Sequence, residues 1–163
     1  MKIRRFLAVM IIAVITCTAL AACGKTELET SVFSVTAPSG WGVIKRTIDG
    51  SEKDDQVYVI KDGEIQTDTL SHPNVLVSYY KNASDYALTK SSFKDASDIS
   101  SFKEGDLTWE GYTYTYSGTS SACITAKDGD ALWVCTLVLE KGGEKISLDD
   151  EDVKSILSSL KAK

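Results

Sequence analysis

The sequence predicts an α+β domain, with an antiparallel sheet of about six strands flanked by helices. Runs of β-branched and aromatic residues, separated by short turns that contain glycine, predict the strands. A helical stripe predicts the last element, because its apolar positions recur at i, i+3, i+4 and i+7. These positions are Val153, Ile156, Leu157 and Leu160. The domain is expected to span residues 31–163, long enough to bury roughly two thirds of its surface.

The first half of this domain predicts a series of strands. They are expected at 31–36, 41–44, 56–60, 65–67 and 74–80. A turn is expected at Pro38-Ser39-Gly40, between the first two strands. Asp62-Gly63 indicates a β-hairpin, because both residues tolerate a positive φ angle.

A helix is predicted next, over about Asp85–Ser92. Asn82 or Ser84 can cap its first turn, because a short polar side chain accepts a hydrogen bond from a free backbone amide. Its apolar contacts would be Tyr86, Leu88 and Phe93. The serine-rich stretch 94–101 is expected to be a loop or a frayed helix end.

Two further hairpins are predicted before the final helix. In the first, Glu110-Gly111 would turn between strands at 107–109 and 112–116. That register would place Leu107, Trp109, Tyr112, Tyr114 and Tyr116 on one face. We expect this face to be core under the final helix; if exposed, it would suit stacking on a sugar or a peptide.

The second hairpin suggests a disulfide between Cys123 and Cys135. A three-residue loop, Asp128–Asp130, would set the two cysteines directly opposite each other, at a Cα separation of about 4.5–5.5 Å. Two alternatives stay open. The cysteines can be reduced core residues, or a two-residue turn can place the sulfur atoms on opposite faces of the sheet.

The start of the chain has the layout of a secretory signal peptide over residues 1–22. Lys2, Arg4 and Arg5 are followed by an apolar run too short to span a membrane comfortably. Leu20-Ala-Ala-Cys23, followed by Gly24, resembles the lipobox of bacterial lipoproteins. The resemblance implies that Cys23 becomes the lipidated, palmitate-bearing N-terminus, with residues 23–30 as a short tether. The alternative is an ordinary cleaved signal peptide.

Charge limits the partners of the mature chain. Loss of the three basic residues of the signal peptide changes the formal net charge from -5 to -8. Such a chain is repelled by phosphate backbones, so no nucleic acid is expected as a partner. Attachment to the extracytoplasmic face of the cell membrane would depend on the lipid of Cys23.

Motifs for catalysis, cofactors and metals are not found in the sequence. His72 is the only histidine, and no nucleophile elbow, Cys-x-x-Cys pair or glycine-rich phosphate loop is present. The acidic clusters do not have EF-hand spacing, although a weak calcium site stays an alternative. We therefore expect no catalytic residue, no cofactor and no metal, and we expect that the protein is not an enzyme.

The stretch Phe33–Trp41, a strand that runs into Pro-x-Gly-Trp, resembles the first strand of PsbP-like (Mog-type) domains. The Glu110-Gly111 hairpin and the ending Val153–Lys161 resemble small lipoproteins of the same group. This resemblance implies an α/β/α sandwich and an accessory role, with no shared catalytic motif. The expected function is a non-enzymatic binding or accessory module of the cell envelope, with an envelope protein or a small ligand as partner. The alternative is a small envelope or extracellular hydrolase.

Overall fold

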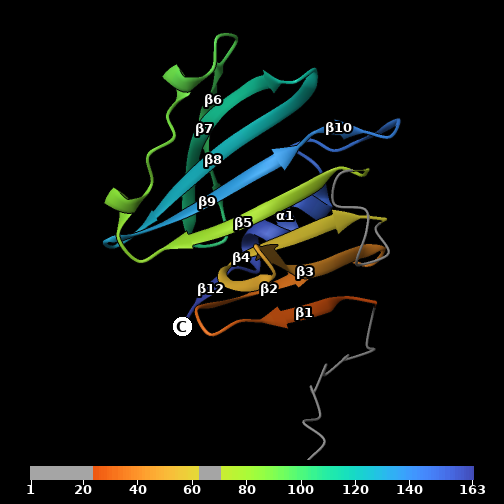
Figure 1. The fold of residues 1–163 in the computed structure, drawn as a ribbon, viewed down its shortest axis with the longest axis vertical. Helices are drawn as coiled ribbons and strands as arrows, with labels where there is room; N and C mark the ends of the chain where they lie inside the picture. The colour runs from red at the N-terminus through yellow and green to blue at the C-terminus, as the bar shows by residue number, and fades with distance from the viewer. Residues whose placement is uncertain (1–23, 63–70) are drawn as a thin grey trace, which may run out of the picture.

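The computed structural model describes residues 24–62 and 71–163, and antiparallel sheets dominate it (Figure 1). The largest sheet has seven strands in the order β3-β4-β5-β9-β8-β7-β6, and a smaller sheet has the order β1-β2-β12. The strands are β1 Thr26–Glu29, β2 Phe33–Ala37, β3 Trp41–Ile48, β4 Ser51–Lys61, β5 Asn74–Tyr80, β6 Ser97–Glu104, β7 Leu107–Tyr116, β8 Thr119–Asp128, β9 Ala131–Val138, β10 Glu140–Lys141, β11 Glu144–Lys145 and β12 Lys161–Ala162.

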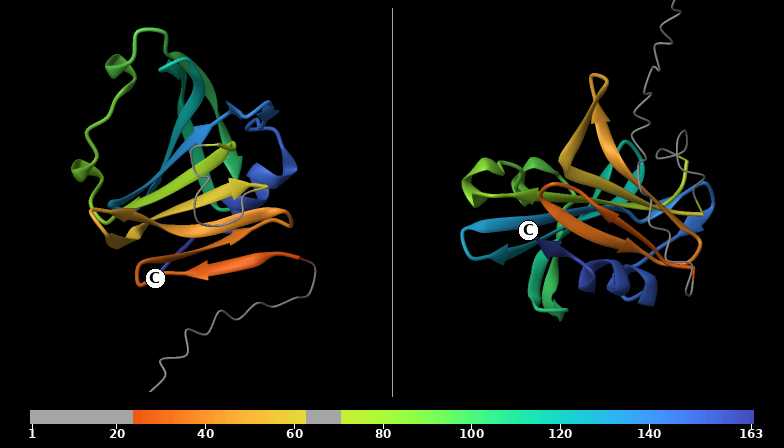
Figure 2. Two further views of the ribbon diagram at one scale, coloured as in Figure 1. Left: turned by 45° about the vertical axis from the view of Figure 1, so that its right-hand side comes forward. Right: turned by 90° about the horizontal axis from the view of Figure 1, so that it is seen from below.

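The main core lies between one face of the large sheet and a layer formed by β2 and the helix α1 (Glu151–Ser158). Alternate residues of the central strands point into it, as Val57 and Val75 do. The helix contributes its predicted stripe, and Val153, Ile156 and Leu157 are buried. Seen from below, α1 lies on one side of the large sheet (Figure 2, right). The prediction of this helix is therefore confirmed over Glu151–Ser158, whereas Leu160 lies beyond its end and Lys161–Ala162 form β12.

A second, smaller cluster lies on the opposite face of the large sheet. Its buried members are Tyr112, Cys123, Leu132 and Val134. The segment 81–96, here called the strap, covers them with partly buried side chains such as Tyr86 and Phe93. The strap leaves the end of β5 and crosses to the start of β6 (Figure 1, green).

The predicted helix at 85–92 is wrong. The strap instead contains two single 3₁₀ turns, η1 (Ala83–Asp85) and η2 (Lys90–Ser92). Leu88, which a helical stripe would bury, is 56% exposed. The strap is held by separated aromatic contacts and not by a continuous apolar stripe, so tertiary contacts override the local helical pattern.

The predicted loop at 94–101 is also wrong over its second half, which belongs to β6. This strand is at the edge of the large sheet and pairs only with β7. The register shifts between Ile99 and Phe102, as at a β-bulge. Most of its side chains are exposed, and therefore the sequence does not alternate as in a half-buried strand.

The predicted hairpin at Glu110-Gly111 does not form, because β7 runs without interruption through both residues. Trp109 and Tyr112 consequently point to opposite faces of the sheet. Trp109 is fully buried in the main core, whereas Tyr112 belongs to the cluster under the strap. The single aromatic face expected under the final helix is thus divided between two cores.

The fold is more β-rich than the predicted α/β/α sandwich. Within 24–62 and 71–163, α1 is the only α-helix, and it covers one face of the large sheet.

Residues 26–29, expected as part of a tether, form β1 and pair with β2. Asp49-Gly50, a turn that the sequence analysis passed over, joins β3 to β4 with positive φ at both residues.

Some predictions concern residues outside the described ones. They are the signal peptide, Cys23, and the strand at 65–67 with Gly63 of the expected hairpin. In the part of the chain that the structure does describe, no helix has the length and apolar character needed to cross a bilayer.

Candidate functional site

The predicted disulfide does not form, and the register of β8 and β9 gives the reason. Asp128 pairs with Ala131, so the turn has two residues and not three. Cys123 is therefore opposite Thr136, and Cys135 is opposite Ile124. This shift of one residue places the two sulfur atoms on opposite faces of the sheet. Both residues are free cysteines and both are buried.

The two thiols have different environments. Cys135 is fully buried in the main core, and this burial raises the pKa of its thiol. Cys123 lies under the strap, where its Sγ is 3.1 Å from the Tyr86 hydroxyl. This contact fixes the middle of the strap to the sheet, and the ring of Tyr86 also packs against Tyr80, with 5.4 Å between ring centroids.

A second tyrosine, Tyr112, stands beside this contact. It pairs with Cys123 across β7 and β8, and only 9% of its surface is exposed. Burial and the neighbouring Cys123 raise the pKa of Tyr112. Burial also raises the pKa of Tyr86, and its hydrogen bond to Cys123 adds to the effect. Although these groups are close, the Tyr112 hydroxyl has no hydrogen-bond partner of good geometry among the described residues. Such a buried polar group is costly.

The strap is fixed to the sheet at separate places. The backbone amide of Ala83 donates to the carbonyl of Asp130 at one end. At the other end, Phe93 stacks on Tyr114, with ring centroids 4.0 Å apart. Between these places the backbone of the strap bows away from the sheet (Figure 2, left), although the Tyr86 side chain reaches Cys123 of β8.

A groove of about 650 Å³ lies between the strap and the large sheet. Its lining includes Tyr86, Leu88 and Lys90 from the strap, and Glu110, Tyr112 and Leu132 from the sheet. This volume lies within the range of about 300–1,000 Å³ that is usual for small-molecule sites. The groove combines aromatic, aliphatic and charged side chains, so it is our candidate site.

Charges at the groove are only partly paired. Lys90 of the strap forms an ion pair with Asp98 of β6, with 2.7 Å between Nζ and Oδ2. Glu110 lies two residues before Tyr112 on β7 and therefore shares its face. The Glu110 side chain is exposed, and its carboxylate makes no hydrogen bond or ion pair within the described residues, so this negative charge of the groove has no protein partner.

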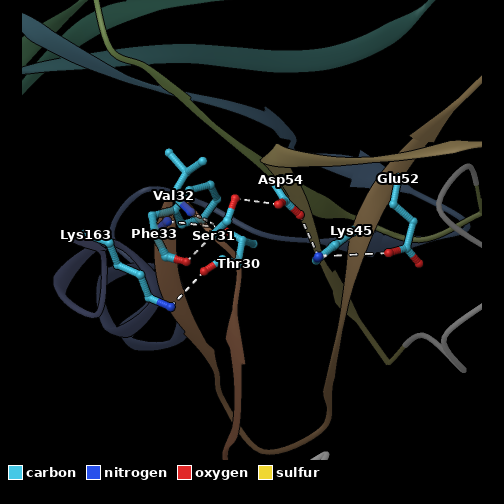
Figure 3. Close-up of polar contacts among 8 residues, drawn as sticks. All are labelled: Thr30, Ser31, Val32, Phe33, Lys45, Glu52, Asp54 and Lys163. Atoms are coloured by element: carbon cyan, nitrogen blue, oxygen red, sulfur yellow. Dashed lines mark hydrogen bonds and ion pairs between the residues drawn. The ribbon is translucent and has the colours of Figure 1, made fainter. Parts of the chain in front are cut away.

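A polar network elsewhere in the molecule connects the turn after β1 to the hairpin β3–β4 (Figure 3). Asp54 accepts hydrogen bonds from the Lys45 ammonium, at 2.6 Å, and from the Ser31 hydroxyl. Lys45 lowers the pKa of Asp54, and Ser31 adds to the effect. Glu52 is at the edge of the network, 4.0 Å from the same ammonium. Since these groups satisfy one another, we interpret the network as structural.

His72 lies at the other end of the large sheet from the groove. It comes just before β5, whereas Leu132 of the groove pairs with Tyr80, the last residue of β5. The Nδ1 atom of His72 is 3.2 Å from a carboxylate oxygen of Glu144, so the side chain is paired and not simply solvated. Across 24–62 and 71–163, no group of three or more His, Cys, Asp or Glu side chains is arranged to hold a metal.

Comparison with known proteins gives only distant neighbours. No family model and no curated protein matches the chain. A crystal structure from Bacteroides thetaiotaomicron has a TM-score of 0.48 and 19% identity, and covers 86% of this chain. This chain spans about half of that protein, 48%. The solution structure of cyanobacterial PsbP (CyanoP) from Synechocystis sp. PCC 6803 has a TM-score of 0.45 and 13% identity, and covers 91% of this chain and 98% of that one.

Several residues of this region are recognisable in the sequence, but their proximity is not. Tyr86, Leu88 and Phe93 were expected as one face of a helix, and Tyr112 as part of another hairpin. A usable signal was present, namely large apolar residues within an otherwise polar segment that has no clear periodicity. Such a segment predicts a covered loop, but the strand that it covers is not specified by the local sequence.

Proposed function

We propose that this chain is a lipid-anchored, extracytoplasmic protein of the PsbP-like type whose folded domain binds a ligand without a chemical reaction. The anchor would be Cys23, and the binding site would be the groove under the strap. The observation that carries the binding role is this groove of about 650 Å³, with the uncompensated carboxylate of Glu110 and the exposed Leu88. Side chains of such mixed character around one concave site are typical of ligand sites.

Two features support the anchor. The sequence Leu20-Ala-Ala-Cys23 after an apolar run is the pattern expected for lipidation. The first described strand, β1, begins at Thr26, so that only Gly24 and Lys25 lie between it and Cys23 in the sequence. A lipid on Cys23 would therefore hold the domain directly against the membrane surface and keep its groove near membrane-associated partners.

The anchor is tested in cells that make the full chain, with an alkyne-labelled fatty acid and detergent phase separation. The wild type should take up the label and partition with detergent, and Cys23→Ala should do neither, because the thioether needs the sulfur atom. Cys17→Ala is the matched control, since it removes the other cysteine of the same segment. Label and detergent partitioning retained by Cys23→Ala would refute the anchor.

A further inference from the structure

The charge and the apolar surface of the groove point to a ligand class, and we propose that the groove binds a small organic cation, an ammonium group on an aromatic or aliphatic body. This inference rests on the proposed function, in which the groove is the ligand site. It goes further by assigning the charge and the shape of the ligand.

The carboxylate of Glu110 supplies the counter-charge. The other charged groups of the groove, Lys90 and Asp98, neutralise each other at 2.7 Å. Glu110 is on the same strand and face as Tyr112, and it has no partner within the described residues. An ammonium group near Glu110 would make a charge-assisted hydrogen bond, which is stronger than a neutral one.

The walls of the groove suit the apolar body of such a ligand. Leu88 is 56% exposed, and it lines the groove together with a second apolar residue, the buried Leu132. Tyr86 and Tyr112 line the groove with aromatic side chains, and aromatic rings attract cations that come within about 6 Å. A cation attached to an apolar body can therefore satisfy both parts of the groove.

The charge of the whole molecule favours the same class. The full sequence has a formal net charge of -5, which becomes -8 without residues 1–22. This field attracts cations and repels anions over several ångströms before contact. Anionic ligands are consequently disfavoured both by the long-range field and by Glu110.

Two probes of similar shape, benzylamine and benzyl alcohol, test the inference. Each is titrated into the full-length protein in detergent, and calorimetry measures its binding. Benzylamine should bind at least about fivefold more tightly than the alcohol, because only the amine is charged near neutral pH. Glu110→Gln should remove this preference. Glu27→Gln, an exposed position on β1 in the other sheet, should retain it. Leu88→Ser should weaken the binding of both probes.

The possible results separate the ligand class from the binding site. Equal binding of both probes, unchanged by Glu110→Gln but weakened by Leu88→Ser, would overturn the cation inference and leave the groove as a binding site. If neither probe binds the wild type, or if Leu88→Ser leaves the binding of both unchanged, then both the inference and the proposed ligand site are wrong. The lipid anchor has its own test and does not depend on either result.

Discussion

Among single residues, Tyr112 has an unusual environment. Its hydroxyl is buried beside a thiol and a second tyrosine hydroxyl, yet the short contact in this group joins Tyr86 to Cys123. A buried hydroxyl that makes no hydrogen bond costs roughly 1–3 kcal/mol relative to a satisfied one. Removal of this hydroxyl alone should therefore be harmless near neutral pH.

The Tyr112→Phe variant should be at least as stable as the wild type at about pH 8, and should lose less stability as the pH rises. Burial, with Cys123 nearby, raises the folded-state pKa of Tyr112 above the value of about 10 for an unfolded tyrosine. The folded protein then keeps a proton that the unfolded chain releases. The contribution of Tyr112 to the free energy of unfolding is therefore fully present below about pH 10, and it is lost as the pH rises toward the folded-state pKa.

Urea unfolding at about pH 8 and about pH 11 measures this difference. Tyr116→Phe is the control, because the Tyr116 side chain is 66% exposed on the same strand. It should keep the pH dependence of the wild type. If Tyr112→Phe lost as much stability as the wild type between the two pH values, the Tyr112 hydroxyl would not be buried as described.

The two cysteines show which part of the hairpin could be predicted from its residues and which part could not. The sequence identified both strands of the hairpin β8–β9, and it also identified the turn sequence that joins them. It did not decide between two and three turn residues, because Asp128, Gly129 and Asp130 all favour turns. That single choice moves Cys123 from opposite Cys135 to opposite Thr136.

At the scale of elements, the continuity of β7 depends on Gly111. A Cβ atom at this position would lie 2.0 Å from the carbonyl oxygen of Cys123 on β8. Glycine is therefore required here because two backbones approach closely, and not because a turn is present. Glu110-Gly111 between aromatic runs predicts a hairpin from local sequence, and only the neighbouring strand distinguishes the two cases.

Gly111→Ala should destabilise the protein by about 3 kcal/mol, because the backbone of β8 would have to move away from the new methyl group. Thr113→Ala, at a partly exposed position of the same strand, is the control and should cost less than about 1 kcal/mol. Chemical unfolding of both variants measures the two costs. A cost for Gly111→Ala no larger than that for Thr113→Ala would contradict the close approach of β7 and β8.

Over the whole molecule, the first and the last described strands, β1 and β12, both pair with β2. β1 and β12 pair with opposite edges of β2, which packs against the main core. Both Thr26–Glu29 and Lys161–Ala162 are short, and apart from the partly buried Leu28 their residues are exposed, so neither has a run of alternation long enough to predict a strand. The sequence predicted an antiparallel sheet and the final helix, but it missed β6 and the continuity of β7 within the large sheet. It did not predict the pairing of β12 with β2, because that pairing joins residues more than 120 positions apart, as Lys161 with Ser34.

Removal of residues 161–163 should destabilise β1 and β2 although it removes no core side chain. β12 pairs with β2 over Lys161 and Ala162, and the amide of Lys163 donates to the carbonyl of Val32 at 2.9 Å. The Lys163 ammonium also donates to the carbonyl of Thr30 at 2.7 Å. Since each of these bonds contributes roughly 1 kcal/mol, the loss should be about 2–3 kcal/mol.

Hydrogen exchange identifies where that loss acts. In the shortened chain, the amides of β1 and β2 should exchange faster, whereas those of β9 in the centre of the large sheet should change little, because local openings follow local contacts. Lys161→Ala with Lys163→Ala is the control, since it keeps the backbone pairing and removes only the partly exposed ammonium contacts. Most of the protection should therefore remain in the control. Equal exchange in the wild type and the shortened chain would mean that β12 does not hold the β1–β2 layer, and that α1 and the large sheet alone keep this layer in place.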